Sequence, residues 1–210
     1  MLWGKKKIEC PYCQKTLEKK PSRKTKCPFC KEYIFVRNQE LVTKERAKIL
    51  DALKRLEISD TFYDVVKKDM TKSLGCEPNF IDVLKSTLEH YLGIIKTLSL
   101  HEKKMKHYSM SIIMNENNQE SFPYLQQSAK MNLLSLKEDG YTEEVELSGG
   151  SCPSCQKLKG KILTIDEALE QMPIPNKNCS HVLYDEKRGF CRCEYYPSSE
   201  IMREARKKYE

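Results

Sequence analysis

The chain has 210 residues, of which 39% are hydrophobic and 32% are charged, with a formal net charge of +7. This composition is typical of a globular protein, and no window approaches the roughly 18 consecutive apolar residues of a membrane span. The N-terminus lacks the apolar run of about 7–15 residues of a signal peptide. We therefore expect a cytoplasmic protein without membrane contact, whose ten cysteines are reduced and available to metal.

The positive charge is concentrated at the N-terminal end. Residues 1–37 contain eleven Lys and Arg but three acidic residues, so the rest of the chain is close to neutral. Four thiolates around one Zn²⁺ would add a net −2, which leaves this segment with a net charge of about +6. The basic balance of the protein therefore belongs to one small module.

Two matched Cys-Pro-aromatic-Cys turns lie in this basic segment. Cys10 and Cys13 form the first pair, and Cys27 and Cys30 form the second. Cysteines three apart in a tight turn can point both thiolates at one ion, and a second such turn completes a tetrahedron around Zn²⁺. The first pair alone is similar to a glutaredoxin active site, but no βαβ pattern follows it, so we expect structural zinc.

The segment 8–37 resembles the zinc-ribbon family, whose members commonly bind nucleic acids or protein surfaces. Residues 33–36 have strand-like character, and Tyr12 and Phe29 are aromatics of the type exposed at such surfaces. Basic residues that would suit phosphate contacts are Lys15, Lys19, Lys20, Arg23, Lys24, Lys26 and Lys31. The alternative is that these lysines only keep a small domain soluble.

Residues 38–140 have the apolar period of helices. The first helix follows Thr43 as a candidate N-cap, and the second ends at Gly75, the usual C-terminal glycine. The third enters through Pro78-Asn79, and the fourth carries Met105, Tyr108 and Ile112 up to the polar run 115–120. A fifth is expected to begin at Ser121 as its cap and to end near Gly140, and it could pair with the fourth as a hairpin.

The apolar stripes of these helices are interpreted as core. The second helix, for example, has a stripe of Phe62, Val65, Val66, Met70 and Leu74. Cys76 follows the end of this helix without a nearby partner, and we interpret it as a free thiol.

The period changes after Gly140. Val145 and Leu147 alternate as in a short strand, and residues 162–165 have the composition of another. Thr164 and Glu167 have the spacing of a capping box, which predicts a short helix over 166–172. The charged tail, 198–210, is expected to be a solvated helix.

A second cysteine-rich region lies between residues 141 and 197. It contains six candidate metal ligands: Cys152, Cys155, Cys179, His181, Cys191 and Cys193. One tetrahedral ion needs four of them. The preferred set is Cys152, Cys155, Cys191 and Cys193, and Cys179 could replace either member of the last pair. His181 is a further ligand candidate, a group hydrogen-bonded to a ligand, or a solvated turn residue.

The cysteine pair of this region is followed by Leu158 and the sequence Gly160-Lys161-Ile162, by prolines and by a closing Cys-Arg-Cys. Residues 148–197 thereby resemble the C-terminal motif of phage Mu F-like minor head (head-morphogenesis) proteins. The resemblance implies that Cys152, Cys155, Cys191 and Cys193 bind metal and that the protein joins in head assembly. The chain departs from the family in having Gly189-Phe190 where histidine and proline usually precede Cys-Arg-Cys.

Signatures of zinc enzymes are missing from the sequence. Ser151, not proline, precedes Cys152, so the deaminase motif is absent. His101-Glu102 is not followed by a second histidine at the spacing of a metalloprotease. A zinc hydrolase or transferase at the C-terminal site is therefore the least favoured function.

These patterns together predict an α+β protein. We expect a basic zinc ribbon at 1–37, a helical region at 38–140, a cysteine-rich zinc-binding module at 141–197 and a charged tail at 198–210. The expected function is that of a non-enzymatic interaction or assembly protein, phage- or prophage-derived and virion-associated if the resemblance holds. It would bind about two Zn²⁺ per chain and a protein partner. The alternative is a nucleic-acid-binding protein that uses the basic ribbon.

Overall fold

The computed structural model describes residues 8–140, 142–182, 189–200 and 204. The chain divides into two compact units, residues 1–84 and 85–210. Across the described residues, seven helices and two three-stranded antiparallel sheets make an α+β fold with a helical middle, as the sequence predicts. In this part of the chain no helix combines the length and apolarity that crossing a bilayer requires. The finer division at residues 37, 140 and 197 stays a prediction.

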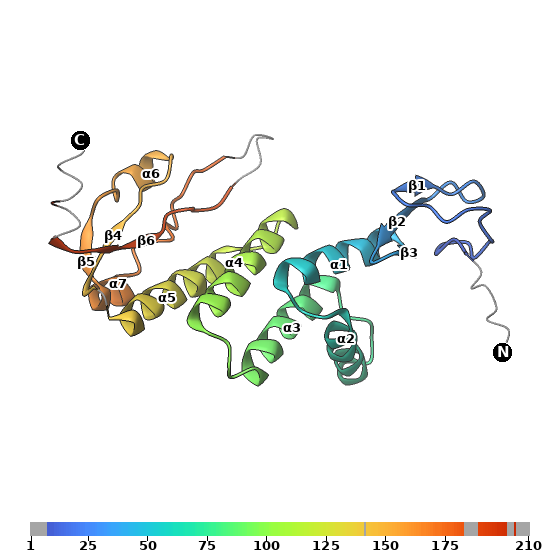
Figure 1. Ribbon diagram of the computed structural model, residues 1–210, viewed down its shortest axis with the longest axis horizontal. Helices are drawn as coiled ribbons and strands as arrows, with labels where there is room; N and C mark the ends of the chain where they lie inside the picture. Colours follow the sequence, from blue (N-terminus) through green and yellow to red (C-terminus); the bar gives the residue numbers. More distant parts are fainter. Residues whose placement is uncertain (1–7, 141, 183–188, 201–203, 205–210) are drawn as a thin grey trace. The chain divides into compact units, whose positions relative to one another are not determined.

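The first unit begins with a small sheet of order β1-β2-β3, formed by Thr25–Lys26, Tyr33–Arg37 and Glu40–Val42 (Figure 1). Thr25 pairs with Ile34, and Phe35 pairs with Val42. The strand at 33–36 is confirmed, whereas β3 was not predicted. Among the described residues of the ribbon, the buried core cluster consists of Cys10, Leu17, Cys27 and Ile34.

Helices α1 (Lys44–Leu56) and α2 (Asp60–Leu74) follow the ribbon sheet. Thr43 caps α1 as predicted, because its hydroxyl accepts a hydrogen bond from the N–H of Arg46 at 3.2 Å. Gly75 ends α2 with a φ of 69°, in the left-handed region that favours glycine. Both helix boundaries were therefore predictable from local chemistry.

The predicted apolar stripe of α2 is only partly buried. Tyr63 and Val66 are the buried residues of this helix. Val65 and Leu74 are 58% and 59% exposed, so their interpretation as core residues is wrong. Because the short α2 has one face against its unit, a stripe this wide cannot all be covered.

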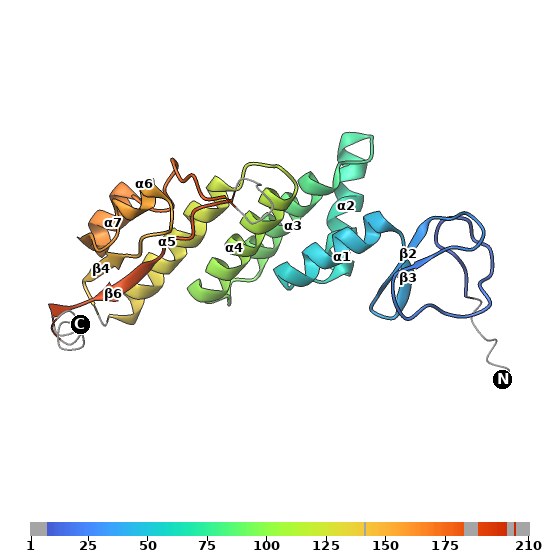
Figure 2. The same ribbon diagram turned by 90° about the horizontal axis from the view of Figure 1, so that it is seen from above.

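The second unit is organised around an antiparallel pair of helices, α4 (Leu100–Glu116) and α5 (Phe122–Asp139), which lie side by side in Figures 1 and 2. The preceding helix α3 (Phe80–Ile94) crosses the division between the units. Asn79 caps α3 through its side chain, which accepts from the N–H of Asp82. The predicted helical hairpin is thus formed.

The N-terminus of α5 differs from its prediction. Ser121 occupies the cap position, but it has helical angles (φ −96°, ψ −18°) and makes no side-chain cap hydrogen bond. Pro123 follows at the second helical position, where it removes one of the N–H groups that a capping side chain would accept from. Gly140 ends the helix with a φ of 66°, as predicted.

A second sheet of order β5-β4-β6 packs beside α5. Its strands are Ile162–Thr164, Glu144–Leu147 and Tyr195–Ser198. Strands β4 and β5 were predicted, whereas β6 was not. A one-turn helix α6 (Pro153–Gln156) and helix α7 (Ile165–Gln171) complete the unit, and the Thr164–Glu167 capping box is present. The expected tail helix falls mostly on residues outside the described part.

This sheet, α5 and α7 share one core with the C-terminal cysteines. Leu133 of α5 packs with Val145 and Leu147 of β4, and the same buried cluster includes Cys155 and Cys191. The cysteine-rich region is therefore built onto the helical hairpin through common buried side chains.

Candidate metal centres

The four N-terminal cysteines converge on one point. The Sγ atoms of Cys10, Cys13, Cys27 and Cys30 all lie within 4.8 Å of one another. Two separations between the turns are 3.8 Å, from Cys10 to Cys30, and 3.9 Å, from Cys13 to Cys27. Four sulfurs at about 2.3 Å from a zinc ion lie about 3.8 Å apart at the corners of a tetrahedron. The cluster therefore fits a tetrahedral metal ion of the size of Zn²⁺.

Each N-terminal turn is built by the same backbone hydrogen bonds. The N–H of Gln14 donates to the carbonyl of Cys10, and the N–H of Lys31 donates to the carbonyl of Cys27. Gln14 and Lys31 both have left-handed backbones, with φ of 59° and 67°. This repeated turn points both thiols of a pair in one direction, which explains why the spacing is diagnostic.

The close approach of these thiols lowers the pKa of one of them and raises the pKa of another. Burial raises the pKa of Cys27, but hydrogen bonds from the N–H groups of Cys30 and Phe29 bring that pKa down to about 6. For Cys30, the N–H of Glu32 lowers the pKa, yet burial and the other sulfurs raise it to about 12. Like charges this close oppose each other, so a cation among the sulfurs is needed for all four to be thiolates.

The C-terminal region brings five cysteines together. Cys152, Cys155 and Cys179 form one group of Sγ atoms within 4.8 Å, and Cys155, Cys191 and Cys193 form another. Cys155 belongs to both groups. Two of the separations are 3.7 Å, from Cys152 Sγ to Cys179 Sγ, and 3.8 Å, from Cys155 Sγ to Cys191 Sγ. These two lengths again match the edges of a zinc–thiolate tetrahedron.

Backbone amides point at the sulfurs of this cluster. The N–H of Gly150 lies 3.2 Å from Cys193 Sγ, and the N–H of Asn176 lies 3.2 Å from Cys191 Sγ. A Cβ on Gly150 would lie 3.4 Å from Cys193 Sγ, so the chain passes close to the cluster here. Such N–H groups stabilise thiolates, as ligand sulfurs require.

His181 lies outside both cysteine groups of the described structure. Its Nδ1 is 3.3 Å from the hydroxyl of Ser151, the residue before Cys152. The carbonyl of His181 accepts a hydrogen bond of 2.8 Å from the N–H of Gly189. Among the six sequence candidates, the structure thus brings the five cysteines together and places the histidine beside them.

In the C-terminal cluster, too, some thiols have a lowered pKa and others a raised pKa. The Cys193 side chain lowers the pKa of Cys191, and, against the effect of burial, the N–H of Asn176 helps to bring it to about 5. The pKa of Cys193 is raised by Cys191 and by burial, and that of Cys155 by burial and by Cys152. A divalent cation among these sulfurs would offset the repulsion between neighbouring thiolates and allow all of them to ionise.

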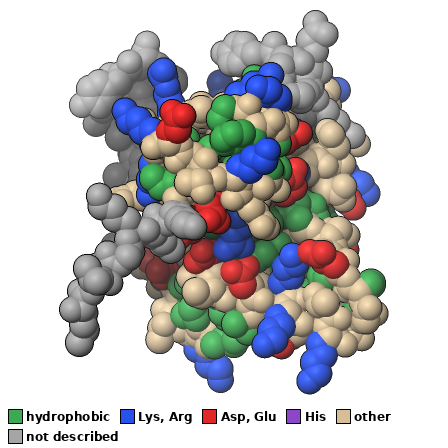
Figure 3. Space-filling view, turned by 90° about the vertical axis from the view of Figure 1, so that its right-hand side faces the viewer, with side chains coloured by type: hydrophobic (Ala, Val, Ile, Leu, Met, Phe, Trp, Pro, Cys, Tyr) green, Lys and Arg blue, Asp and Glu red, His purple; other side chains and the backbone are tan. Residues whose placement is uncertain are grey.

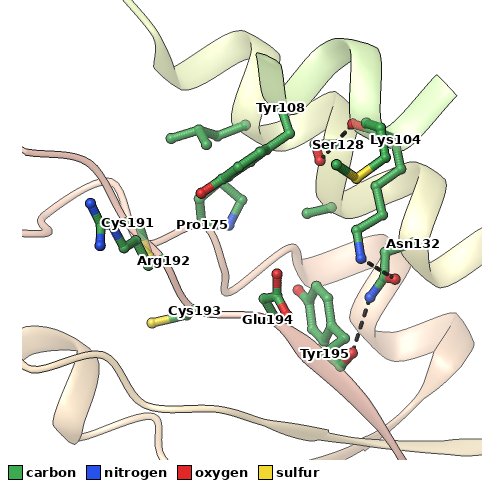
Figure 4. A pocket seen from close by; sticks show the side chains of 13 residues that line it. Lys104, Tyr108, Ser128, Asn132, Pro175, Cys191, Arg192, Cys193, Glu194 and Tyr195 are labelled. Atoms are coloured by element: carbon green, nitrogen blue, oxygen red, sulfur yellow. Dashed lines mark hydrogen bonds between the residues drawn. The ribbon is translucent and has the colours of Figure 1, made fainter. Parts of the chain in front are cut away.

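The C-terminal cysteine segment and the helical hairpin together line a cavity of about 180 Å³. Figure 4 shows Cys191, Arg192 and Cys193 on the segment that leads to Tyr195, with Tyr108 and Asn132 on the helices. Lys104 donates to the Asn132 side chain, which in turn donates to the carbonyl of Tyr195 at 3.0 Å. The segment with Cys191 and Cys193 is therefore anchored to α4 and α5 by polar contacts as well as by the core.

The candidate nucleic-acid residues are exposed on the ribbon. The set Lys15, Lys19, Lys20, Arg23, Lys24, Lys26 and Lys31 is solvent-exposed throughout. Phe29 is 48% exposed, as expected. Tyr12 differs from expectation, because it packs against the ribbon core and its hydroxyl accepts from the N–H of Lys44 at 2.7 Å. Tyr33, 50% exposed, was missed as a surface aromatic.

No protein-family model matches the chain, and neither the curated proteins nor the solved structures compared with it give a match. The resemblances to zinc ribbons and to Mu F-like head proteins therefore have only the residues quoted above as support. The metal-binding arrangement of the cysteines stands on its geometry alone.

Proposed function

We propose that the protein is a non-enzymatic binding protein held in shape by two structural Zn²⁺ ions, one in each cysteine cluster. The observation that carries the proposal is the sulfur spacing of 3.7–3.9 Å in both clusters, which matches zinc–thiolate tetrahedra. Cysteine-only donors favour zinc over magnesium or calcium, which prefer oxygen ligands. When bound, each ion would cross-link segments distant in sequence.

The proposed C-terminal ligands are Cys152, Cys155, Cys179 and Cys191. Two short separations, Cys152–Cys179 at 3.7 Å and Cys155–Cys191 at 3.8 Å, together include each of these four residues once. The N-terminal cluster also has two short separations, and its four sulfurs all lie within 4.8 Å of one another. At the C-terminal cluster that limit holds for two groups of three that share Cys155, so one ion would have to draw Cys191 towards Cys152 and Cys179. This set uses Cys179 in place of Cys193, one of the alternatives that the sequence left open.

Four thiolates on one ion leave no position for an exchangeable water, so this ligand set argues against a zinc hydrolase or transferase. The direct test is metal analysis of protein purified without added metal or chelator. We expect about two zinc per chain. A well-folded protein with no bound zinc would overturn the proposal, and a C-terminal zinc with three protein ligands and a water would revive the hydrolase.

A nucleic-acid-binding role is the second candidate, and a specific observation favours it. None of Lys15, Lys19, Lys20, Arg23, Lys24 and Lys26 takes part in an ion pair with another described residue. Unpaired cations can release counterions from phosphates, so binding should weaken steeply with salt. Replacing Lys19, Lys20, Arg23 and Lys24 by Ala should flatten that dependence.

A role in phage head assembly rests on the sequence motif around the C-terminal cluster. That cluster, with its shared core on α5, is a rigid element suited to bind a protein partner. The genes beside this one provide the test. Capsid or terminase genes next to it would support an assembly role, and a neighbourhood without phage genes would oppose it.

A further inference from the structure

The outer face of strand β2 in the ribbon carries an aromatic row. Tyr33 and Phe35 lie on the same face, because alternate residues of a strand share a face, and Ile34 between them is buried. Tyr33 is 50% exposed, and Phe29, in the turn before the strand, is 48% exposed. The rings of Phe29 and Tyr33 are thus exposed to solvent, and that of Phe35 is half-buried.

Lysine side chains surround these rings. Lys24 Nζ lies 4.6 Å from the centre of the Tyr33 ring and 5.1 Å from that of Phe35. Lys26 Nζ lies 6.0 Å from Tyr33, and Lys15 Nζ lies 5.2 Å from Phe29. Figure 3, which views the side of Figure 1 where β1–β3 lie, shows Lys and Arg side chains beside exposed hydrophobic ones. Each of the three rings therefore has at least one lysine ammonium over its face.

We infer that this surface, formed by Phe29, Tyr33 and Phe35 with Lys15, Lys24 and Lys26, binds single-stranded nucleic acid by stacking unpaired bases on the rings. The inference rests on the second candidate function above and names its ligand. Lysine alone would attract any polyanion, whereas exposed aromatic rings add a contact that only an accessible base can make.

The spacing of the rings favours a single strand over a duplex. Two residues along a strand span about 6.8 Å, which is twice the roughly 3.4 Å between stacked bases in one DNA strand. Bases on Tyr33 and Phe35 must therefore be drawn apart from each other. A duplex keeps its bases stacked and paired, so it offers these rings no base face.

The lysines that cover the rings can make way for bases. A lysine side chain is long and flexible, and its ammonium interacts only weakly with a ring at an exposed site. Stacking of a base on an aromatic side chain is the stronger contact. On binding, each ammonium would move from the ring to a neighbouring phosphate, so both groups keep a partner.

The test compares a fluorescein-labelled single strand of about 12 nucleotides with the duplex of the same sequence, by fluorescence anisotropy with the full zinc-loaded chain. We expect tighter binding of the single strand. Tyr33→Leu, which leaves the net charge unchanged, should weaken single-strand binding by about 5- to 100-fold and leave duplex binding unaltered. Tyr196→Leu is the matched control, because Tyr196 is 48% exposed but lies on β6.

Other results have distinct meanings. Equal affinity for single strand and duplex, unaffected by Tyr33→Leu and Phe29→Leu, would overturn this inference and leave a purely electrostatic nucleic-acid binder. Binding of neither at low salt would overturn the second candidate function as well. Zinc content and circular dichroism of each variant show that it is folded, and they judge the two-zinc proposal independently.

Discussion

The two cysteine clusters have similar sulfur spacings but different surroundings. In the described part of the ribbon the buried core has four residues, and two of them, Cys10 and Cys27, belong to the N-terminal cysteine cluster. The C-terminal cluster lies in a core of twelve buried residues that includes Leu133 and Val145. The comparison teaches that a similar cysteine cluster can take the place of a hydrophobic core in one region and lie within a larger hydrophobic core in another.

The backbone that carries the cysteines also differs between the two clusters. The N-terminal turns end in left-handed residues, Gln14 and Lys31, and lie outside the helices and strands of the ribbon. At the C-terminal site Cys152 caps helix α6, because its carbonyl and sulfur accept N–H groups from the next turn. The C-terminal ligands therefore belong to ordinary secondary structure and tertiary packing.

Metal removal should give the largest contrast between the two regions. A strong zinc chelator is expected to unfold residues 8–42, because a structural zinc supplies on the order of 10 kcal/mol to a small domain. Helices α4 and α5 should persist. The measurement is a two-dimensional amide NMR spectrum before and after chelation. Ribbon resonances that keep their dispersion without metal would refute the view that zinc replaces the core there.

Serine substitutions at the C-terminal cluster come next. We expect Cys179→Ser to lower the zinc content from about two per chain to about one, because it removes a ligand, whereas Cys193→Ser should keep about two. Metal analysis after desalting measures both. Cys76→Ser is the control, since Cys76 is exposed and outside the clusters. The reverse outcome for Cys179 and Cys193 would assign the fourth ligand to Cys193.

A cavity in the shared core should act on the C-terminal region alone. Leu133 is fully buried between α5 and β4, so Leu133→Ala is expected to lower the free energy of unfolding of the second unit by about 2–5 kcal/mol. Urea denaturation followed by circular dichroism measures the effect. Leu74→Ala, at a side chain 59% exposed, should change it by less than about 0.5 kcal/mol. An equal effect of both changes would contradict the proposed dependence on packing.

An ion pair beside the ribbon should have the smallest effect. Arg37 holds Asp51 of α1 through two hydrogen bonds of 2.6 and 2.7 Å, and both side chains are partly exposed. Arg37→Gln is therefore expected to cost about 0.5 kcal/mol or less in thermal unfolding of the zinc-loaded protein, and 0.5 M salt should reduce the difference.

The sign of the pH effect follows from the same pair. The Arg37 guanidinium lowers the pKa of Asp51 from its ordinary value of 3.8. The stabilisation is thus fully present above pH 3.8 and is lost as the pH falls through the lowered pKa. A loss of several kcal/mol in Arg37→Gln at neutral pH would show that the ion pair, and not only zinc, determines ribbon stability.

Local chemistry was readable from the sequence, and long-range pairing was not. The caps at Thr43 and Gly75 and the capping box at Thr164 depend on neighbours within four residues, and all three were predictable. A second capping box, Ser99 with Glu102, had an equally clear spacing and was overlooked. Strand β6 contains Pro197 and has little apolar alternation, so only its pairing with β4 reveals it.

The metal sites show the same limit. The N-terminal ligands follow from spacing alone because two identical turns provide them. The place of Cys179 depends instead on its contact with Cys152, 27 positions earlier, which no local pattern contains. The exposed aromatic row on β2 could have been found from the alternation of Tyr33, Ile34 and Phe35, but the sequence did not show which face is buried.

The hydrogen bond from Gly189 to the carbonyl of His181 brings together the two ends of a chain segment between Cys179 and Cys191. A Cβ on Gly189 would lie 2.5 Å from the His181 ring, so the approach depends on glycine. The chain two positions after Cys179 is thereby held beside the chain two positions before Cys191. A side chain at position 189 is therefore expected to disturb the positions of both cysteines at once.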